Sequence, residues 1–464
     1  MNFIKSDELT AKAIKLIPAV KTFYDTYTFL QKSQWWSQKH LEQYQMMKLS
    51  KLLNHSYSNV PYYRRVFEQR GLKPGDIQNI ADLKKLPYLT KEIIRENLPD
   101  MIARNYLKSK LEYVTTGGST GIPLGFYYEK GFSRAREQAF MTALWSRVGY
   151  KLSDKCVILR GYVVDSANQG KFWKNSLLGR WLILSSFHMT DELLPSYIDK
   201  ISEFRPAYIQ AYPSSVTLLA WFMQKKGIKP FPSIKAILCG SENIYPWQRE
   251  LLEQVFQCRV YSWYGHTEQA VLGGECEKST FYHLNPEYGI TELSSSTGMV
   301  ITEEDAIGEI IATGLNNFCV PLIRYRTMDL AISTNTECGC GRHYRLLKKI
   351  EGRVQEFIVS NKGSLIPLGP AIFGIHDINW ARIKQIQFLQ ETAGKLTINV
   401  VKDKCYSVAE IEDYTLRLFK ARFEGYCELE IVFVDNIPRT ASGKYKWLIQ
   451  KLPIEFGDQS GNFI

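Results

Sequence analysis

The most informative segment of this chain reads Thr115-Thr116-Gly117-Gly118-Ser119-Thr120-Gly121-Ile122-Pro123. Its three glycines permit positive φ angles and close backbone approach, so successive N–H groups can converge on phosphate oxygens. A strand pattern follows and no Gly-Lys-Ser/Thr is present, so the loop is not a Walker A motif. We predict that Thr116–Gly121 binds phosphate. The alternative is a Gly/Ser hairpin turn without a ligand.

Strand and helix patterns alternate around this loop. Short apolar runs of strand length precede amphipathic runs of helix length, and turn residues separate them. Such alternation is typical of an α/β domain whose mixed, mostly parallel sheets are covered by helices. The expected strands are 113–115, 124–128, 207–211 and 234–239, and the expected helices are 38–70, 91–98, 133–147, 214–226 and 246–256.

The tail has a different pattern. Residues 386–391 and 396–401 read as a hairpin, and a helix follows in which Ser407 and Glu410 form a capping box. One more strand is expected at 430–434. This ββαβ order predicts a small α+β domain, so we divide the chain into a large domain, 1–352, and a small mobile domain, 353–464.

Composition limits the class of protein. The chain has 464 residues, 45% of them hydrophobic and 23% charged, which is an ordinary globular balance. It contains no apolar run long enough to span a membrane and no signal-peptide pattern, so we expect a cytoplasmic protein. A net charge of +11 would suit ATP or coenzyme A, and equally RNA or an anionic membrane. Basic residues form no block of five or six, which disfavours nucleic acid.

Six further motifs, two before the loop and four after it, occur in a fixed order. They are Val60–Arg64, Leu86–Lys91, Tyr264–Glu268, Tyr325–Asp329, Ile350–Glu356 and Pro438–Lys444. Over nearly its whole length the chain resembles the adenylate-forming enzymes, and within them the phenylacetate–coenzyme A ligase branch. Relatives of this branch occur in capsule and surface polysaccharide gene clusters.

The resemblance implies a role for each motif. The loop residues Thr116, Gly117, Gly118, Ser119, Thr120 and Gly121 would hold the phosphates of ATP, and Glu268 would lie beside Mg²⁺. Asp329 would accept hydrogen bonds from the ribose hydroxyls, and Lys444 would bridge the substrate carboxylate and the α-phosphate. The other nucleotide-binding positions implied are Gly240, Ser241, Glu242, Tyr264, Gly265, Thr267 and Arg353, with Tyr264 stacked on adenine.

Two positions depart from the pattern of this family. Met328 replaces the usual glycine of the Tyr-Arg-Thr-Gly-Asp motif, and Gln355 replaces the customary aspartate at the domain pivot. A pivot requires permissive backbone more than a particular charge.

The resemblance implies a two-step reaction. A carboxylic acid would react with ATP and Mg²⁺ to give an acyl-adenylate and pyrophosphate, and the acyl group would then pass to coenzyme A. One alternative is transfer to an amine, as in an amide-forming ligase of surface polysaccharide biosynthesis. Another is a non-catalytic nucleotide-binding or scaffold protein. Dimers are frequent among relatives, so a homodimer is an open expectation.

Three residues are candidates for the acid pocket: His188, Tyr212 and His266. A lone histidine is more often structural, so His188 carries little weight. His266 stands where an apolar residue would suit a purely hydrophobic substrate. It therefore indicates a polar group on the acid.

Four further side chains are candidate zinc ligands. The nine cysteines are irregularly spaced and do not resemble a disulfide framework. Three thiolates and an imidazole suit tetrahedral zinc in a structural role, and the candidates are Cys276, His283, Cys338 and Cys340. The alternative is a set of free thiols packed in turns.

Overall fold

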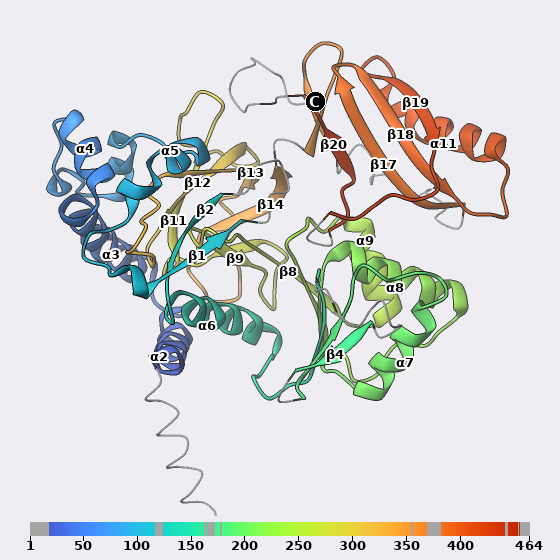
Figure 1. The fold of residues 1–464 in the computed structure, drawn as a ribbon, viewed down its shortest axis with the longest axis horizontal. Coiled ribbons are helices and arrows are strands. Elements are labelled where there is room, and N and C mark those ends of the chain that lie inside the picture. Colours follow the sequence, from blue (N-terminus) through green and yellow to red (C-terminus); the bar gives the residue numbers. More distant parts are fainter. Residues whose placement is uncertain are drawn as a thin grey trace, which may run out of the picture.

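The computed structural model describes residues 18–116, 124–161, 164, 172–176, 179–353, 356–368, 382–440, 444–452 and 454. The described residues form a larger part around a 12-stranded sheet and a smaller part around a four-stranded sheet. Figure 1 shows the smaller part, in orange and red, set above the helices α7, α8 and α9. The phosphate loop 117–121 and Gln355 lie outside the described residues.

The amino-terminal helices are α2 (Pro18–Ser33), α3 (Gln38–Asn59), α4 (Pro61–Gln69) and α5 (Lys91–Met101). Local chemistry explains where they begin. Ser37 caps α3 by accepting from the His40 amide, and Thr90 caps α5 by accepting from the Ile93 amide. Short 3₁₀ segments connect several elements. Apolar side chains of α3, α4 and α5 share one core with the strands that flank the phosphate loop.

Those flanking strands are β1 (Leu111–Thr115) and β2 (Gly125–Glu129), which pair antiparallel. The helix α6 (Ser133–Trp145) follows them. The predicted strand–loop–strand arrangement is confirmed, and the loop is therefore the tip of a hairpin.

The 12-stranded sheet has the order β11-β12-β13-β14-β10-β9-β8-β7-β6-β3-β5-β4. It is mixed, as expected, but parallel pairing is confined to β5-β3-β6-β7-β8. From β8 onward the neighbours are antiparallel, so "mostly parallel" is wrong for this half of the sheet. Its strands are joined by short connections without helices, which do not allow the crossover that parallel strands need. The bounds are β3 (Cys156–Leu159), β4 (Trp173–Asn175), β5 (Trp181–Leu184), β6 (Tyr208–Ala211), β7 (Ala236–Gly240), β8 (Arg259–Gly265), β9 (Leu272–Gly274), β10 (Tyr282–Leu284), β11 (Gly289–Ser294), β12 (Ile307–Gly314), β13 (Tyr325–Ser333) and β14 (Leu346–Arg353).

Helices cover both faces of the parallel segment. On one face, Val157 and Leu159 of β3 pack in a core with α7 (Leu194–Phe204), α8 (Pro213–Lys226) and α9 (Pro246–Phe256). On the other, Cys156 and Ile158 pack with α6 and with Leu30 of α2. Alternate residues of a strand point to opposite faces, so strands buried on both faces are apolar throughout.

The smaller part contains β17 (Ile383–Thr392), β18 (Lys395–Lys402), α11 (Val408–Phe423), β19 (Glu428–Phe433) and β20 (Leu448–Gln450). The expected hairpin, capped helix and following strand are all present, and Ser407 and Glu410 form the capping box. The strand order is β19-β18-β17-β20, in which β20 pairs parallel with β17. The sequence did not indicate β20 because it is only three residues long. A short hairpin of β15 (Phe357–Val359) and β16 (Leu365–Pro367) precedes this unit.

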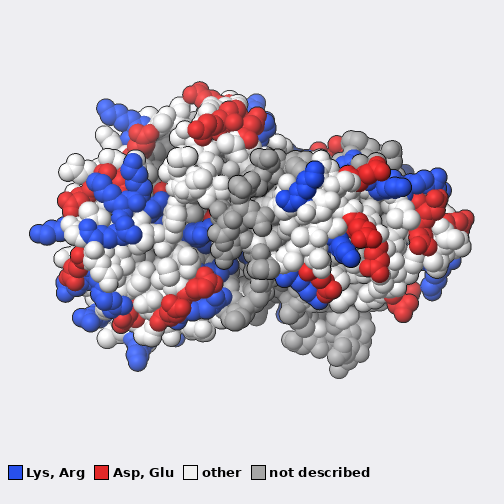
Figure 2. All heavy atoms as spheres, turned by 90° about the horizontal axis from the view of Figure 1, so that it is seen from above, with Lys and Arg blue, Asp and Glu red and all other residues white. Residues whose placement is uncertain are grey.

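Acidic and basic side chains are interspersed over the face shown in Figure 2. This face therefore presents no single-sign stripe of the kind that nucleic-acid binding would require. Within the described ranges, no helix combines the length and the apolar character that a membrane span requires.

A buried ion pair fastens the amino-terminal segment to the large sheet. Arg324 donates from Nε and Nη2 to the Glu292 carboxylate at 3.0 and 2.9 Å. The same guanidinium donates to the Leu86 carbonyl at 2.7 Å and stacks over the Tyr88 ring at 4.4 Å. Backbone bonds between Leu89 and the residues at the start of β13 complete the attachment. The 86–91 motif is thus held beside the Tyr325–Asp329 motif.

We predict that Arg324→Met lowers the unfolding free energy by about 3–5 kcal/mol, because it leaves the Glu292 carboxylate buried without its partner. Chemical denaturation monitored by tryptophan fluorescence measures the change. The matched control is Lys21→Met, which breaks the exposed Lys21–Asp25 pair and should have no measurable effect. A cost equal to that of the control would contradict the role given to Arg324.

Candidate active site

A cavity of about 1170 Å³ lies between the larger and the smaller part. It is lined from both sides by residues that the sequence had singled out separately. The lining includes Thr116, Ser241, Glu242, Tyr264, Gly265, His266, Thr267, Glu268, Asp329, Arg353 and Lys444. Motifs that are far apart in the chain therefore meet around one space.

The base of the phosphate loop is closed by two hydrogen bonds. The Thr116 amide donates to the Leu124 carbonyl at 2.9 Å, and the Leu124 amide donates to Thr116 Oγ1 at 3.0 Å. These bonds extend the β1–β2 pairing by one step. Thr116, the residue before the loop, lines the cavity.

Glu268 is buried where the chain leaves β8. Its Oε1 accepts from the Tyr325 hydroxyl at 2.7 Å, and its Oε2 lies 3.2 Å from His266 Nδ1. Burial alone would raise the pKa of Glu268, but the His266 imidazole and the Tyr325 hydroxyl outweigh it and lower the pKa to about 2. Glu268 is thus an ionised carboxylate at any physiological pH, as a residue facing Mg²⁺ must be.

Asp329 is held from two directions. The Tyr264 hydroxyl donates to its Oδ2 at 2.7 Å, and Arg353 Nε lies 3.3 Å from its Oδ1. The residue before it, Met328, has a φ of 64°, the left-handed conformation that favours glycine. The Met328 amide donates to Glu309 Oε1 at 3.2 Å. Met328 therefore keeps the turn of the motif at the cost of some backbone strain.

The segment Gly240-Ser241-Glu242 ends β7 at the cavity. Ser241 has a φ of 67°, and its Oγ accepts from Arg160 Nη2 at 2.6 Å. The Glu242 carboxylate accepts from the amide of Ser214 at 3.0 Å and from its hydroxyl at 3.1 Å. Since Ser214 lies in the first turn of α8, Glu242 supplies the acceptor that this helix end needs.

The smaller part contributes Lys444. Its amide donates to Thr440 Oγ1 at 3.0 Å, and its carbonyl accepts from the Thr440 amide at 2.9 Å. Its ammonium lies 5.9 Å from the centre of the Tyr212 ring. Burial lowers the pKa of Lys444, whereas the negative charges of Glu242 and Glu356 partly restore it. The ammonium therefore reaches into the cavity and not into solvent.

Two contacts dock the smaller part on the start of α8. The Tyr445 amide donates to Glu242 Oε1 at 3.3 Å, and Arg439 Nη1 lies 3.4 and 3.3 Å from the hydroxyls of Ser214 and Ser215. Both contacts involve neighbours of Lys444. The position of the lysine thus depends on this docking.

Gly352 lies at the carboxyl end of β14. Its φ is 104°, and a Cβ at this position would lie 2.1 Å from Glu356 Oε2 and 2.6 Å from Asn243 Nδ2. The positive φ is a conformation that favours glycine. Arg353, which lines the cavity, follows directly.

Sequence reasoning missed three ionisable groups near the cavity. Burial and the charge of the nearby Arg353 lower the pKa of Lys91. The negative charges of Glu268 and Asp329 partly raise it again. Burial raises the pKa of both Glu137 and Glu356 to about 7. Lys91 stands in a motif that the sequence did highlight. Nothing local distinguishes Glu137 or Glu356 from a solvated glutamate on a helix or loop.

The three candidate pocket residues are placed differently. His266 lines the cavity, and the Tyr212 ring lies beneath Lys444. His188 contacts Ser185 Oγ through Nδ1 at 2.8 Å and is not among the described residues that line the cavity. Its role in the structure described here is therefore a local hydrogen bond.

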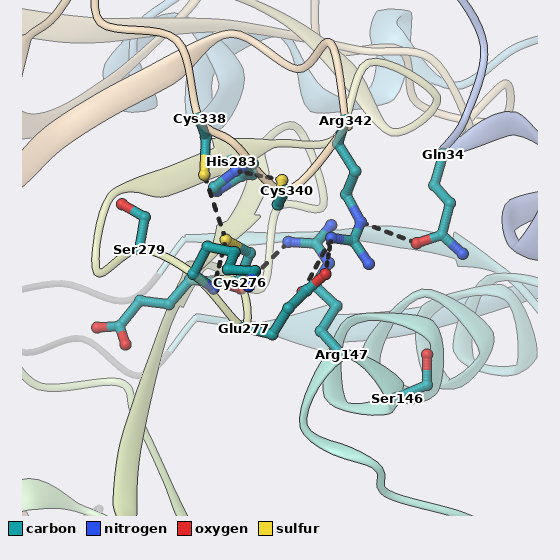
Figure 3. Close-up of polar contacts among 12 residues, drawn as sticks. Gln34, Ser146, Arg147, Cys276, Glu277, Ser279, His283, Cys338, Cys340 and Arg342 are labelled. Atoms are coloured by element: carbon teal, nitrogen blue, oxygen red, sulfur yellow. Dashed lines mark hydrogen bonds and ion pairs between the residues drawn. The ribbon is translucent and has the colours of Figure 1, made fainter.

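The four candidate zinc ligands form one cluster away from the cavity. Their ligand atoms all lie within 4.8 Å of one another. Cys276 Sγ is 3.5 Å from Cys338 Sγ, and Cys340 Sγ is 3.3 Å from His283 Nε2. Figure 3 shows the four side chains pointing toward one another. Tetrahedral zinc with thiolates at about 2.3 Å keeps its ligands roughly 3.5–4 Å apart, so the geometry fits this ion.

Hydrogen bonds and an ion pair around the cluster hold its side chains in place. His283 Nδ1 lies 3.0 Å from the Phe281 carbonyl, which leaves Nε2 facing the thiols. The Lys278 amide donates to Cys276 Sγ at 3.3 Å. Arg342 pairs with Glu277 and bonds Gln34 at 2.9 Å, as Figure 3 also shows. Such outer contacts orient metal ligands.

Comparisons with known proteins agree with this geometry. A model of the CapK C-terminal domain matches residues 358–451. Protein CapK of Staphylococcus aureus is 25% identical over 419 residues, which cover 88% of this chain and 89% of CapK. A phenylacetate-coenzyme A ligase of Pseudomonas putida is 27% identical over 341 residues, 70% of this chain and 74% of the ligase. The crystal structure of 2-hydroxyisobutyryl-CoA ligase in the postadenylation state matches with a TM-score of 0.72 at 18% identity, over 90% of this chain and 91% of that one.

The chain is thus similar in sequence to CapK and to phenylacetate-coenzyme A ligases, and its fold is that of 2-hydroxyisobutyryl-CoA ligase. The predicted resemblance is confirmed.

We predict that Glu137→Gln stabilises the protein more at pH 8 than at pH 4.5. The folded state keeps the Glu137 proton up to a pKa of about 7, whereas the unfolded chain releases it near 4.5. Stability is therefore lost as pH rises between these values and stays lost above them. The gain should reach up to about 2 kcal/mol, since the cavity side of the carboxyl remains in contact with water. Thermal unfolding of both proteins from pH 4.5 to 8 measures it, and a difference that does not change with pH would contradict the assignment.

Proposed function

We propose that this chain activates a carboxylic acid with ATP, forming an acyl-adenylate and pyrophosphate, and then transfers the acyl group to coenzyme A. One observation carries the proposal: Lys444, Glu268 and Asp329 meet around one cavity. Relatives named phenylacetate-coenzyme A ligase support it. The same relatives support coenzyme A as the acyl acceptor.

Each charged group of the cavity suits one portion of ATP. We assign Asp329, held by Tyr264 and Arg353, to the ribose hydroxyls, because a carboxylate accepts two hydrogen bonds at once. The hairpin loop beyond Thr116 would surround the phosphates. Gly240–Glu242, Tyr264, Gly265 and Thr267 would border the nucleotide, as the family resemblance implies. Lys91 adds a buried positive charge near Glu268 and Asp329.

The first step is a substitution at phosphorus. A carboxylate oxygen of the substrate forms a bond to the α-phosphorus of ATP, while the bond to the bridging oxygen breaks and pyrophosphate leaves with its electron pair. Lys444 stabilises the negative charge that gathers on the α-phosphate oxygens. The ionised Glu268 fits Mg²⁺, which when bound neutralises the phosphate charge.

The second step requires Lys444 to leave the cavity and an acceptor to enter. We propose that the parts 1–352 and 353–464 are separate domains that rotate about Gly352–Glu356. The left-handed Gly352 supports a pivot at this point. In the second step the thiol sulfur of coenzyme A would bond to the acyl carbon, AMP would leave, and the thiol proton would pass to solvent.

An amine acceptor is a second candidate. The family model that matches the small domain is that of CapK, and the small domain is the part that would admit the acceptor. CapK also matches more of this chain than the ligases do. The adenylation step is common to both candidates.

We also propose that the chain acts in the cytoplasm on small molecules. All nine cysteines are free thiols, which fits a reducing compartment. Whether two copies associate is a separate expectation, and no described contact bears on it.

We propose a structural zinc ion at Cys276, His283, Cys338 and Cys340. Four protein ligands fill a tetrahedral site, so no position is open for catalysis. The ion would join the β9–β10 turn to the connection between β13 and β14.

We predict that Lys444→Ala lowers acid-dependent ATP–pyrophosphate exchange by at least about 100-fold, because it removes the mobile positive charge from the α-phosphate. The exchange is measured with a panel of carboxylic acids in the absence of any acceptor. The matched control is Lys451→Ala, whose ammonium pairs with Glu391 on the surface of the same domain and which should retain full exchange. Exchange at the wild-type rate in Lys444→Ala would contradict the assigned role.

The same assay separates the candidate functions. AMP release that accelerates only with coenzyme A supports thioester formation, and acceleration only with amines supports the amide-forming alternative. A chain that binds ATP but exchanges pyrophosphate with no acid would be a nucleotide-binding protein without this activity.

We predict that protein purified without chelators contains about one zinc ion per chain and that Cys338→Ser and Cys340→Ser lose it. Elemental analysis measures the metal, and removing it should lower the unfolding temperature. The matched control is Cys405→Ser, which changes an exposed thiol outside the cluster and should retain the zinc. A metal-free wild-type protein with the same unfolding temperature before and after chelation would overturn the site.

A further inference from the structure

One wall of the cavity contains hydrogen-bonding groups that the adenylation step does not use. His266 is the clearest case. Its side chain is only 10% exposed, and neither ring nitrogen makes a well-directed hydrogen bond with a described residue. Its Nδ1 lies close to Glu268 but is poorly oriented toward it. The imidazole is therefore held beside the Glu268 carboxylate, but its ring nitrogens lack hydrogen bonds, which costs free energy unless a ligand supplies them.

Glu137 on α6 lines the same cavity. Its Oε2 accepts from the Tyr288 hydroxyl at 2.5 Å, while Oε1 has no partner among the described residues. No described lysine or arginine forms an ion pair with it. Burial raises the pKa of this carboxyl to about 7. Its Oε1 is therefore available to accept a hydrogen bond from a ligand in the cavity.

We assign these two residues to the part of the cavity that receives the acid, because neither is among the groups assigned to ATP. His266 follows Tyr264 by two residues, and the Tyr264 hydroxyl bonds Asp329. Glu137 comes from α6, which supplies none of the residues assigned to ATP. The neighbouring Gln138 and Tyr128 also line this wall. A polar wall of this kind discriminates by leaving its groups unpaired when the wrong ligand binds.

We infer that the acid substrate bears a second polar group, a hydroxyl or an amino group, which donates a hydrogen bond to Glu137 and pairs with His266. This inference rests on the proposed function and specifies its substrate class. With the carboxylate of the acid at Lys444, the polar group at the other end would complete the hydrogen bonds of Glu137 Oε1 and His266. A purely apolar acid would leave Glu137 Oε1 and the ring nitrogens of His266 without these hydrogen bonds and would displace water from them.

The two candidate donor groups, an ammonium group and a hydroxyl, differ in charge. An ammonium group gains from an ionised carboxylate, whereas a hydroxyl requires only an acceptor oxygen. Glu137→Gln retains an acceptor but removes the charge, and Glu137→Leu removes both. Comparing the two variants thus identifies which donor the wall binds.

The test uses ATP–pyrophosphate exchange by the full chain with matched acids. One trio is phenylacetate, para-hydroxyphenylacetate and para-aminophenylacetate, and the other is butanoate, beta-hydroxybutanoate and beta-aminobutanoate. We expect the wild-type kcat/KM to be at least about 10-fold higher for a donor-bearing acid than for its plain analogue. Glu137→Leu should reduce this ratio to below about 3-fold, mainly through KM. In Glu137→Gln the ratio should persist for a hydroxy acid and fall for an aliphatic amino acid.

Glu112→Gln is the matched control, because Glu112 is a partly exposed carboxylate of β1 that pairs with Arg134 of α6 and is not among the described residues lining the cavity. It should leave the ratio unchanged. AMP binding measured by calorimetry shows that each variant is folded and retains its nucleotide site.

The outcomes distinguish a failure of the inference from a failure of the proposed function. Equal use of plain and donor-bearing acids by the wild type, or an unchanged ratio in Glu137→Leu, overturns the inference and leaves the proposed function in place. It would mean that the Glu137–Tyr288 bond is structural only. Absence of exchange with every acid overturns the proposed function and the inference together.

Discussion

The Glu242 carboxylate joins three parts of the molecule, and the position of Lys444 depends on it. It accepts from the first turn of α8, it follows directly from the end of β7, and it also accepts from the Tyr445 amide of the smaller part. A helix start carries unpaired amides and a partial positive charge, so a carboxylate is stable there. Glu242, which the resemblance had placed beside the nucleotide, therefore also holds the smaller part against the larger part. It is one of the contacts through which the larger part positions Lys444, the candidate catalytic group of the smaller part.

Carboxylates around the cavity have very different pKa values because their surroundings differ. Glu268 has a pKa of about 2 because His266 and Tyr325 outweigh the effect of its burial. Glu137 and Glu356 have pKa values of about 7 because burial dominates. The same side chain can thus serve as a permanent anion for a cation or as a group that shares a proton with a ligand. Differences of this kind arise from neighbours supplied by other segments.

Sequence reasoning succeeded where the signal is local. The helix at 246–256 and the capped helix after Ser407 follow from periodicity and capping, and both are present. The zinc candidates were chosen by chemistry, and the fold brings all four together. Sequence reasoning failed where the structure depends on contacts between residues that are far apart in the chain. The antiparallel half of the large sheet consists of strands whose pairing depends on connection length, and β20 is too short to recognise. Glu137 acquires its importance only from Tyr288 and His266, which lie more than a hundred residues away.

The connection that carries Lys444 runs from β19 to β20, so it is an internal crossover and not a free tail. Its two ends are fixed in one sheet, and the Tyr445 hydroxyl and the Lys446 carbonyl bond Ile386 and Gln387 of β17. The residues that follow the lysine are thereby tied to the four-stranded sheet. In the proposed mechanism, the lysine would therefore leave the α-phosphate together with this sheet. Withdrawal of the charge and opening of the entrance for the acceptor would then be one mechanical event, which would keep the second half-reaction from starting before the first is complete.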